Sequence, residues 1–288
     1  MDARSGAQRP ADSLWMEALG DCSQPRAVYG RVGSTRRVML ALARERVLES
    51  LRDDDLVLDV GGWADPFARA DWVIDIMPYE SRGLYQREGW APASPDRERF
   101  SRETWIQRDV CDRDPYPFAD DEVDFVICSH TLEDVRDPIW VCSELCRIAR
   151  AGYIEVPSRL EEQSWGVTGA FVGWSHHRWL IEIAGREIEF VAKPHGLHSV
   201  EDHHFPAGFW EGLNAEERVQ TLLWEGGFAY RERVIMDPRE HDDYLAAFVA
   251  KELAARPRQR QSTLHNARSR LRRLWDRAGA GKRPQRGH

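Results

Sequence analysis

Short apolar runs alternate with helix-periodic segments through the first half of the chain. The runs are predicted to be buried parallel strands, because each spans only four to seven residues and is bounded by turn or polar residues. They lie at 56–60, 72–76, 105–110, 123–129 and 153–156. Apolar residues recur at helical spacing in 36–51, before the first run, and in 139–149, before the fifth. Strands that alternate with helices predict an α/β fold with a doubly wound, mostly parallel sheet.

The pattern changes after the fifth predicted strand. Residues from 157 to about 210 are rich in Trp, His and Phe, and two apolar segments within them flank Gly185 as a predicted β-hairpin. Helical spacing returns at 214–224, and 230–235 and 244–249 are predicted to be closing strands. We therefore expect a seven-stranded sheet with an aromatic and His-rich hairpin subdomain inserted after the fifth strand.

Charge divides the chain unevenly. The net charge is −8, yet residues 256–288 hold 11 Lys and Arg against the single acid Asp276, so that the remainder carries −18. An acidic body is a poor nucleic-acid surface, because phosphate binding needs clustered positive charge. The tail also has an apolar stripe, and three roles stay open for it: a solvated helix, contact with anionic lipid headgroups at a membrane surface, or contact with an acidic partner or the protein's own acidic body. The predicted organisation is an irregular segment at 1–34, one domain at 35–255 with its insert at about 157–210, and a basic amphipathic tail at 256–288.

Cysteine usage and the first residues bear on the compartment. The five cysteines are odd in number and form no C-x-x-C pair, which predicts neither a disulfide framework nor a zinc ribbon. The opening residues lack an apolar export segment, and no run is long enough to cross a bilayer. We expect a cytoplasmic protein that contacts the inner membrane surface, if at all, only peripherally through its tail.

Polar residues and glycines stand where the predicted strands end. Asp59 lies in the first strand and Gly61-Gly62 follow it, while Asp75 and Asp109 lie at the ends of the second and third. The carboxyl ends of parallel strands form the ligand-binding edge of such a sheet. Glycines let the backbone approach a ligand closely, and a strand-end acid can accept both ribose hydroxyl protons. These residues predict a nucleoside site.

The stretch 109–156 resembles the core of the type 11 family of class I S-adenosylmethionine-dependent methyltransferases. It contains Asp109-Val-Cys-Asp, then Pro117-Phe-Ala-Asp-Asp-Glu-Val-Asp-Phe-Val-Ile-Cys-Ser-His-Thr-Leu-Glu-Asp-Val135 and Asp137-Pro. With Asp59-Val-Gly-Gly and Val-Ile-Asp75, the resemblance covers about 55–156. It implies a Rossmann-like fold and S-adenosylmethionine as cofactor.

The same resemblance implies a role for individual residues. Gly61 would line the methionine moiety and Asp75 the ribose, Asp109 and Val110 the adenine, and Ser129 and His130 the edge near the transferable methyl. The predicted cofactor-binding residues are Asp59, Gly61, Gly62, Asp75, Asp109, Val110, Ser129 and His130.

The glycine loop departs from the usual family pattern. Gly61-Gly-Trp-Ala-Asp-Pro66 has two adjacent glycines instead of three alternating ones, and only 67–71 remain for a helix before the second strand. So short a loop offers little helix N-terminus for a pyrophosphate, which argues against a nicotinamide dehydrogenase. It resembles a methyltransferase subgroup with a Gly-Gly-x-x-x-Pro-Phe turn, which favours cofactor binding, and the alternative is a degenerate site that has lost its cofactor.

Histidines supply the candidate bases. Methyl transfer needs an aligned nucleophile whose proton leaves, and His130 and His177 are the candidate catalytic residues. The spacing of the histidines in 176–204 matches no zinc signature, so no metal is expected.

Two functions follow from the sequence. The favoured hypothesis is methyl transfer from S-adenosylmethionine to a small-molecule or glycan acceptor, which the aromatic insert would cover and select. The alternative is a non-catalytic binding or scaffold protein that keeps the methyltransferase fold and uses its basic tail at a membrane surface or partner.

Overall fold

The computed structural model describes residues 39–87 and 97–256. Contacts along the chain separate Met1–Gly33 from Ser34–His288, and every described residue belongs to the second unit. The predicted segment 1–34 lies outside the described residues, as does the predicted tail apart from Arg256. The division into domains therefore stays a prediction.

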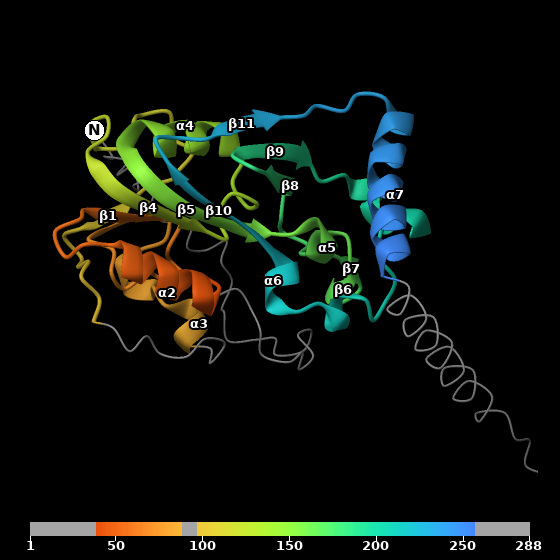
Figure 1. The fold of residues 1–288 in the computed structure, drawn as a ribbon, viewed down its shortest axis with the longest axis horizontal. Coiled ribbons are helices and arrows are strands. Elements are labelled where there is room, and N and C mark those ends of the chain that lie inside the picture. The colour runs from red at the N-terminus through yellow and green to blue at the C-terminus, as the bar shows by residue number, and fades with distance from the viewer. Residues whose placement is uncertain (1–38, 88–96, 257–288) are drawn as a thin grey trace, which may run out of the picture. The chain divides into compact units, whose positions relative to one another are not determined.

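A six-stranded sheet forms the centre of the described unit, in the order β10-β5-β4-β1-β2-β3 (Figure 1). Neighbouring strands are parallel, except that β10 runs antiparallel to β5. The strands are β1 Val57–Val60, β2 Trp72–Asp75, β3 Trp105–Gln107, β4 Val123–Ser129, β5 Ala149–Pro157 and β10 Val219–Glu225. The doubly wound, mostly parallel sheet is confirmed. The prediction of seven strands is wrong for the described residues, where the central sheet has six.

Apolar side chains cover the sheet on both faces. On one face α4 packs with the hairpin β8–β9 over Leu58 and Val126 in the larger core cluster. On the other face α2 and the loop 63–71 pack over Val57 and Phe125 in a second cluster. Because neighbouring strand residues point to opposite faces, a strand buried on both sides needs apolar residues throughout. The helices here are α2 Ala41–Ser50, η2 Tyr79–Ser81, α3 Leu84–Arg87 and α4 Pro138–Ile148.

The insert builds small sheets of its own. The predicted hairpin is confirmed, with β8 and β9 antiparallel and β11 adding a parallel strand to β9. A second, two-stranded sheet pairs β6 with β7. These elements are α5 Arg159–Glu162, β6 Trp165–Thr168, β7 Phe171–Val172, β8 Trp179–Ala184, β9 Glu187–Ala192, η3 His195–His198, η4 Glu201–His203, η5 Trp210–Gly212 and β11 Ala229–Glu232.

Three predictions near the end of the described chain differ from the structure, although the strand predicted at 230–235 does form over Ala229–Glu232. The predicted helix 214–224 is one short turn, α6 Ala215–Arg218, followed by β10, where Leu222 and Trp224 are buried at the two-residue spacing of a strand. The predicted closing strand 230–235 is β11, which joins the insert sheet. The predicted strand 244–249 lies inside α7 Pro238–Ala255, because Asp237 caps the helix and Leu245 and Val249 bury one face of it.

Candidate functional site

The glycine loop turns sharply at the end of β1. Gly61 has φ +81°, and its N–H donates to the Ile74 carbonyl at 2.8 Å. A Cβ at Gly61 would lie 2.1 Å from Thr131 Oγ1, and one at Gly62 would lie 2.1 Å from Asp59 Oδ2. Neither position has room for a side chain, because Gly61 packs against Thr131 in the loop after β4 and Gly62 packs against Asp59.

The carboxylate of Asp59 holds the glycine loop in place. Its side chain is buried, and Oδ2 accepts the N–H of Phe67 at 2.8 Å. Burial raises the pKa of Asp59 to about 7, and the nearby carboxylates of Asp75 and Asp65 add to the shift, although the Phe67 N–H opposes it. Asp59 thus holds the shape of the site.

Asp75 joins two backbone segments at the end of β2. Oδ2 accepts from Trp63 N at 3.0 Å, and Oδ1 accepts from Met77 N at 2.8 Å. Burial raises the pKa of the Asp75 carboxyl, while these backbone hydrogen bonds act in the opposite direction. Each carboxylate oxygen has two lone pairs, so the group can still accept from ribose hydroxyls.

Asp109 and Val110 follow β3. Asp109 Oδ1 accepts from Cys111 N at 2.8 Å, and Oδ2 forms a close ion pair with Arg136. Val110 is buried, and its carbonyl accepts the Tyr116 hydroxyl at 2.8 Å. The predicted adenine-site acid therefore already has a cationic partner from the protein.

Ser129 and His130 lie at the end of β4. Ser129 Oγ is buried without a hydrogen-bond partner in the described part of the chain. His130 has φ +52°, a conformation that a non-glycine residue adopts only under strain, and its N–H donates to the Glu155 carbonyl at 2.8 Å. An unused polar atom next to a strained residue is typical of a ligand site.

The His130 ring is buried between two acids. Nδ1 lies 3.5 Å from Glu133 Oε1, and Nε2 lies 3.0 Å from Glu155 Oε1. Burial alone would lower the pKa of His130, yet the two carboxylates raise it to about 9. A protonated imidazole has no lone pair with which to accept a proton. The two acids therefore stabilise the protonated ring, and the general-base role of His130 stays a prediction.

His177 lies on the loop between β7 and β8. Its Nδ1 is 2.7 Å from Glu162 Oε1, and its Nε2 is 4.0 Å from Glu133 Oε1. Glu162 also accepts from Lys193 Nζ at 2.7 Å. Although burial raises the pKa of Glu162, the His177 and Lys193 contacts lower it to about 2. Both predicted catalytic histidines thus approach the same acid, Glu133, which joins the insert to the sheet edge.

A small cavity of about 40 Å³ lies at the glycine loop. Its lining includes five of the predicted cofactor-binding residues, which are Asp59, Gly61, Gly62, Ser129 and His130. Asp75, Asp109 and Val110 do not line it, nor does His177. The sequence prediction missed Arg44, Asp65 and Tyr85 in this lining.

The sequence prediction also missed Glu133 and Glu155 as partners of His130. One signal was present, because Glu155 interrupts the apolar run of the fifth predicted strand and a buried acid there needs a partner. Glu155 also accepts from Leu40 N at 3.1 Å and from the Tyr153 hydroxyl. Its position in β5 therefore links the start of α2 to the His130 loop.

Residues 88–154 match the family model described as a methyltransferase domain, in the type 11 family. The resemblance inferred from the sequence is confirmed, and the chain contains a methyltransferase domain. S-adenosylmethionine is the cofactor that this family implies. No curated protein matches the chain.

Several solved structures resemble part of the chain. An S-adenosylmethionine-dependent methyltransferase from Aquifex aeolicus is 19% identical, over 39% of this chain and 62% of that one, with a TM-score of 0.26. An arsenic(III) S-adenosylmethionine methyltransferase from Chlamydomonas reinhardtii is 20% identical, over 35% and 38%, with a TM-score of 0.26. A phosphoethanolamine N-methyltransferase from Haemonchus contortus is 16% identical, over 40% and 27%, with a TM-score of 0.27. The chain spans less than two thirds of each, and likenesses this partial carry no argument about its chemistry.

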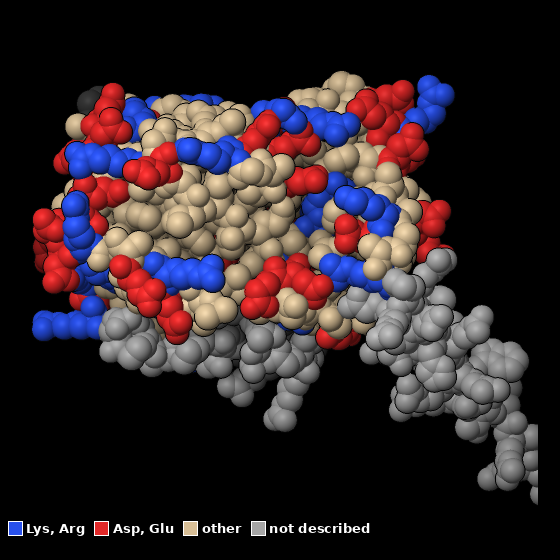
Figure 2. All heavy atoms as spheres, in the orientation of Figure 1, with Lys and Arg blue, Asp and Glu red and all other residues tan. Residues whose placement is uncertain are grey.

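Surface charge and the character of the helices bear on possible partners. On the face drawn in Figure 2, basic and acidic side chains are interspersed, and the described residues show no continuous basic area there. Among the described residues, no helix has the length and apolar character that crossing a membrane requires.

Proposed function

We propose that this chain transfers a methyl group from S-adenosylmethionine to a small-molecule or glycan acceptor. The observation that carries the proposal is the cavity at the carboxyl edge, where the glycine loop meets Ser129 and His130, two residues of the stretch 88–154 that matches the methyltransferase domain. The buried Ser129 hydroxyl without a partner supports a ligand there, because such a group normally finds a hydrogen bond.

The proposed cofactor contacts are the eight residues predicted from the sequence. The methionine moiety would lie along the Gly61–Gly62 backbone, and Asp75 would accept from the ribose. Bound there, the cofactor supplies an electrophilic methyl carbon on its sulfonium. The chain's own contribution would be alignment of the acceptor and exclusion of water, with the His130 ring, held between Glu133 and Glu155, in the wall of the site.

The cavity lining and the contacts of Asp109 indicate how the cofactor would fit. The cavity lining leaves out Asp75, Asp109 and Val110, so a cofactor that contacts all eight proposed residues must extend beyond the cavity. Asp109 keeps its ion pair with Arg136, and the lone pairs that remain on its oxygens can accept from an adenine amino group.

The insert is the proposed acceptor-binding part. Most of its large aromatic residues form the core of the insert, including Trp174, Phe205 and Phe209, whereas Phe171 is exposed. The aromatic platform predicted from composition is therefore mostly packing. The polar loop that carries His177 is the part of the insert that approaches the sheet edge, and we propose that it contacts the acceptor.

Calorimetric titration of S-adenosylmethionine and S-adenosylhomocysteine tests the proposal. We expect micromolar-range binding to the full chain and at least tenfold weaker binding to Asp75→Ala, because hydrogen bonds to a charged group contribute about 1.5–3 kcal/mol. Asp54→Ala is the matched control, since this exposed acid precedes β1 at the opposite end of the strand. Equal affinity in Asp75→Ala and the wild type, with both folded, would remove Asp75 from the site.

A non-catalytic scaffold is the second candidate. It is favoured by the short glycine loop, and by the close ion pair that Arg136 makes with Asp109. The same titration separates the two functions, because a folded chain that binds neither ligand supports the scaffold. Under either function, contact of 256–288 with a membrane surface or acidic partner, and a cytoplasmic location, remain our proposals.

A further inference from the structure

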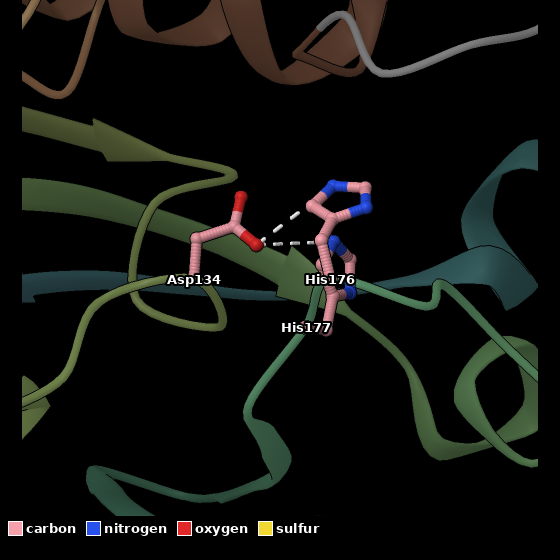
Figure 3. A group of neighbouring side chains, drawn as sticks. All are labelled: Asp134, His176 and His177. Atoms are coloured by element: carbon pink, nitrogen blue, oxygen red, sulfur yellow. Dashed lines mark ion pairs between the residues drawn. The ribbon is translucent and has the colours of Figure 1, made fainter. Parts of the chain in front are cut away.

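Three side chains with metal-binding atoms face one another beside the sheet edge (Figure 3). Asp134 Oδ1 lies 3.8 Å from His176 Nε2 and 3.7 Å from His177 Nε2. One potential ligand atom from each residue lies within 4.8 Å of the others. Metal bonds of about 2.0–2.1 Å place tetrahedral ligands about 3.3 Å apart, so a bound ion would draw these atoms closer by about 0.5–1.5 Å. The His176 side chain is 54% exposed and can rotate to do so.

A buried acid orients His177. Its Nδ1 is 2.7 Å from Glu162 Oε1, and a proton on Nδ1 leaves the lone pair on Nε2, which faces Asp134. A histidine that donates one ring N–H to a carboxylate while the other nitrogen binds metal is the usual outer arrangement of a metal site. Glu162 is itself held by Lys193, whose Nζ also donates to the Trp174 carbonyl at 2.9 Å.

The two loops that carry the cluster are joined by hydrogen bonds. Arg178 N donates to the Glu133 carbonyl at 2.7 Å, and Arg178 Nε donates to the Asp134 carbonyl at 3.0 Å. Trp179 Nε1 donates to the Val135 carbonyl at 2.8 Å. The backbone positions of the ligands are thus fixed by the fold, so metal binding would not have to order the loops.

We propose that Asp134, His176 and His177 bind one divalent transition-metal ion. Two histidines and one carboxylate suit zinc or iron(II) and leave coordination positions open. Glu133, whose Oε1 lies 4.0 Å from His177 Nε2, adds a second negative group. An oxygen or nitrogen of the methyl acceptor could fill an open position, and this role alone rests on the proposed function. Glu133 also contacts His130, so the metal would lie next to the proposed cofactor edge.

The binding test needs no cofactor. Tag-free, full-length protein is stripped with a chelator, and Zn²⁺ is then titrated against a chromophoric competitor. We expect one tight site per chain. His176→Ala and Asp134→Asn should each weaken it at least a hundredfold, because each removes one of three ligands. His195→Ala is the matched control, an exposed histidine of the same insert that should bind Zn²⁺ as the wild type does.

Further readouts separate a ligand from a residue that only supports the fold. Co²⁺ should give visible ligand-field absorption in the wild type and lose it in His176→Ala. The positioning variant Glu162→Gln should keep the absorption but bind about 10–100-fold more weakly. The proposal is overturned if the wild type binds no Zn²⁺, or if His176→Ala and Asp134→Asn bind like the wild type. Titration of His176→Ala with S-adenosylmethionine in the absence of metal tests the cofactor site separately.

Discussion

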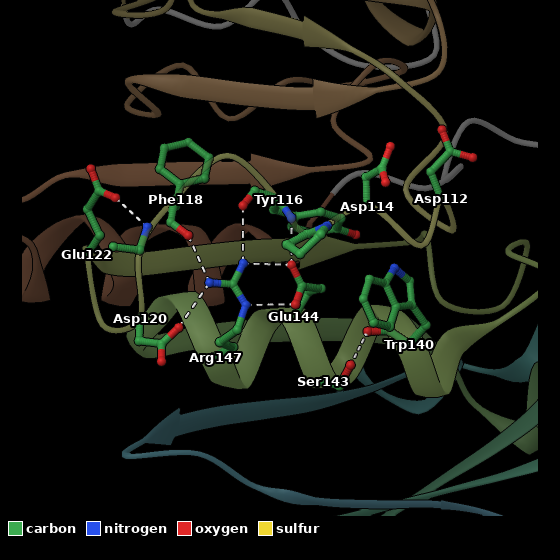
Figure 4. A network of polar contacts seen from close by, with 12 residues as sticks. Asp112, Asp114, Tyr116, Phe118, Asp120, Glu122, Trp140, Ser143, Glu144 and Arg147 are labelled. Carbon is green, nitrogen blue, oxygen red and sulfur yellow. Dashed lines mark hydrogen bonds and ion pairs between the residues drawn. The ribbon is translucent and has the colours of Figure 1, made fainter.

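Two ionic networks flank the central sheet, and they differ in how completely their polar atoms are paired. The first surrounds Arg147, near the end of α4 and beside the loop that leads into β4 (Figure 4). Arg147 donates to both oxygens of Glu144 at 2.7 and 2.8 Å and to Asp120, and it caps the carbonyls of Tyr116 and Phe118. The bonds to Asp120, Tyr116 and Phe118 tie the loop before β4 to α4, so the network stabilises the fold.

The second network surrounds His130. Its ring is held between Glu133 and Glu155 by charge contacts, and neither ring nitrogen has a well-aligned hydrogen bond among the described residues. The backbone of His130 is strained, and the neighbouring Ser129 hydroxyl is unused. Natural proteins keep such features where a ligand or a reaction needs them. The contrast is between an arginine whose hydrogen bonds join two elements of the fold and an imidazole held mainly by charge contacts beside a strained backbone.

The largest expected effect is on the pH dependence of stability. Because the folded pKa of His130 is about 9 against 6.5 unfolded, its contribution is fully present below pH 6.5 and is lost as pH rises through 9. The shift corresponds to about 3 kcal/mol. Urea unfolding of the wild type should therefore show a falling free energy of unfolding from pH 7 to 9.

His130→Asn is the matched variant, because Asn tolerates a positive φ but does not titrate. Its free energy of unfolding should be lower at pH 7 and should change less between pH 7 and 9. Asp59, whose burial raises its pKa to about 7, makes stability fall with pH in the same direction, but mainly between 3.8 and 7. Parallel curves for the two proteins above pH 7 would show that His130 is not held as a cation.

A smaller loss is expected from the paired network. Glu144→Ala leaves Arg147 and the Tyr116 N–H without their main acceptor. The free energy of unfolding should fall by about 2 kcal/mol, which is less than for a fully buried pair because the Arg147 side chain is 27% exposed. Urea unfolding measures it, and S-adenosylmethionine affinity should stay within about twofold. Glu122→Ala is the control, an exposed acid that accepts one backbone N–H from Ala119 and should cost under about 1 kcal/mol. A large loss of cofactor affinity in Glu144→Ala would break the distinction between the networks.

The sequence could predict the elements that depend on short-range patterns of residues. The five core strands and the hairpin at Gly185 follow from apolar runs and turn residues, and the structure confirms them. Segment 214–224 shows where prediction from short-range patterns fails. Its Asn214–Glu217 capping box does begin a helix, yet pairing with β5 converts the rest to β10. Tertiary pairing overrides propensity in such segments.

The site was predictable only in part for the same reason. Strand ends place Asp59, Gly61 and Ser129 together because topology alone brings them to one edge. The meeting of Asp134 with His176 depends on how a loop 42 residues later folds back, and no spacing rule contains that information. The charge of His130 likewise depends on Glu155, which reaches it from a different strand.

The smallest expected change in stability is also the most direct test of incomplete pairing. Ser129→Ala removes a buried hydroxyl that has no partner, so the free energy of unfolding should change by less than about 0.5 kcal/mol. Ser158→Ala is the matched control at the end of the neighbouring β5, where Oγ caps Glu161 N and donates to the Glu217 carbonyl at 2.6 Å. That variant should lose about 1–2 kcal/mol. If the Ser129 hydroxyl contacts the cofactor, Ser129→Ala should nevertheless bind S-adenosylmethionine about three- to tenfold more weakly than the wild type. Unchanged affinity together with unchanged stability would leave the hydroxyl without a role.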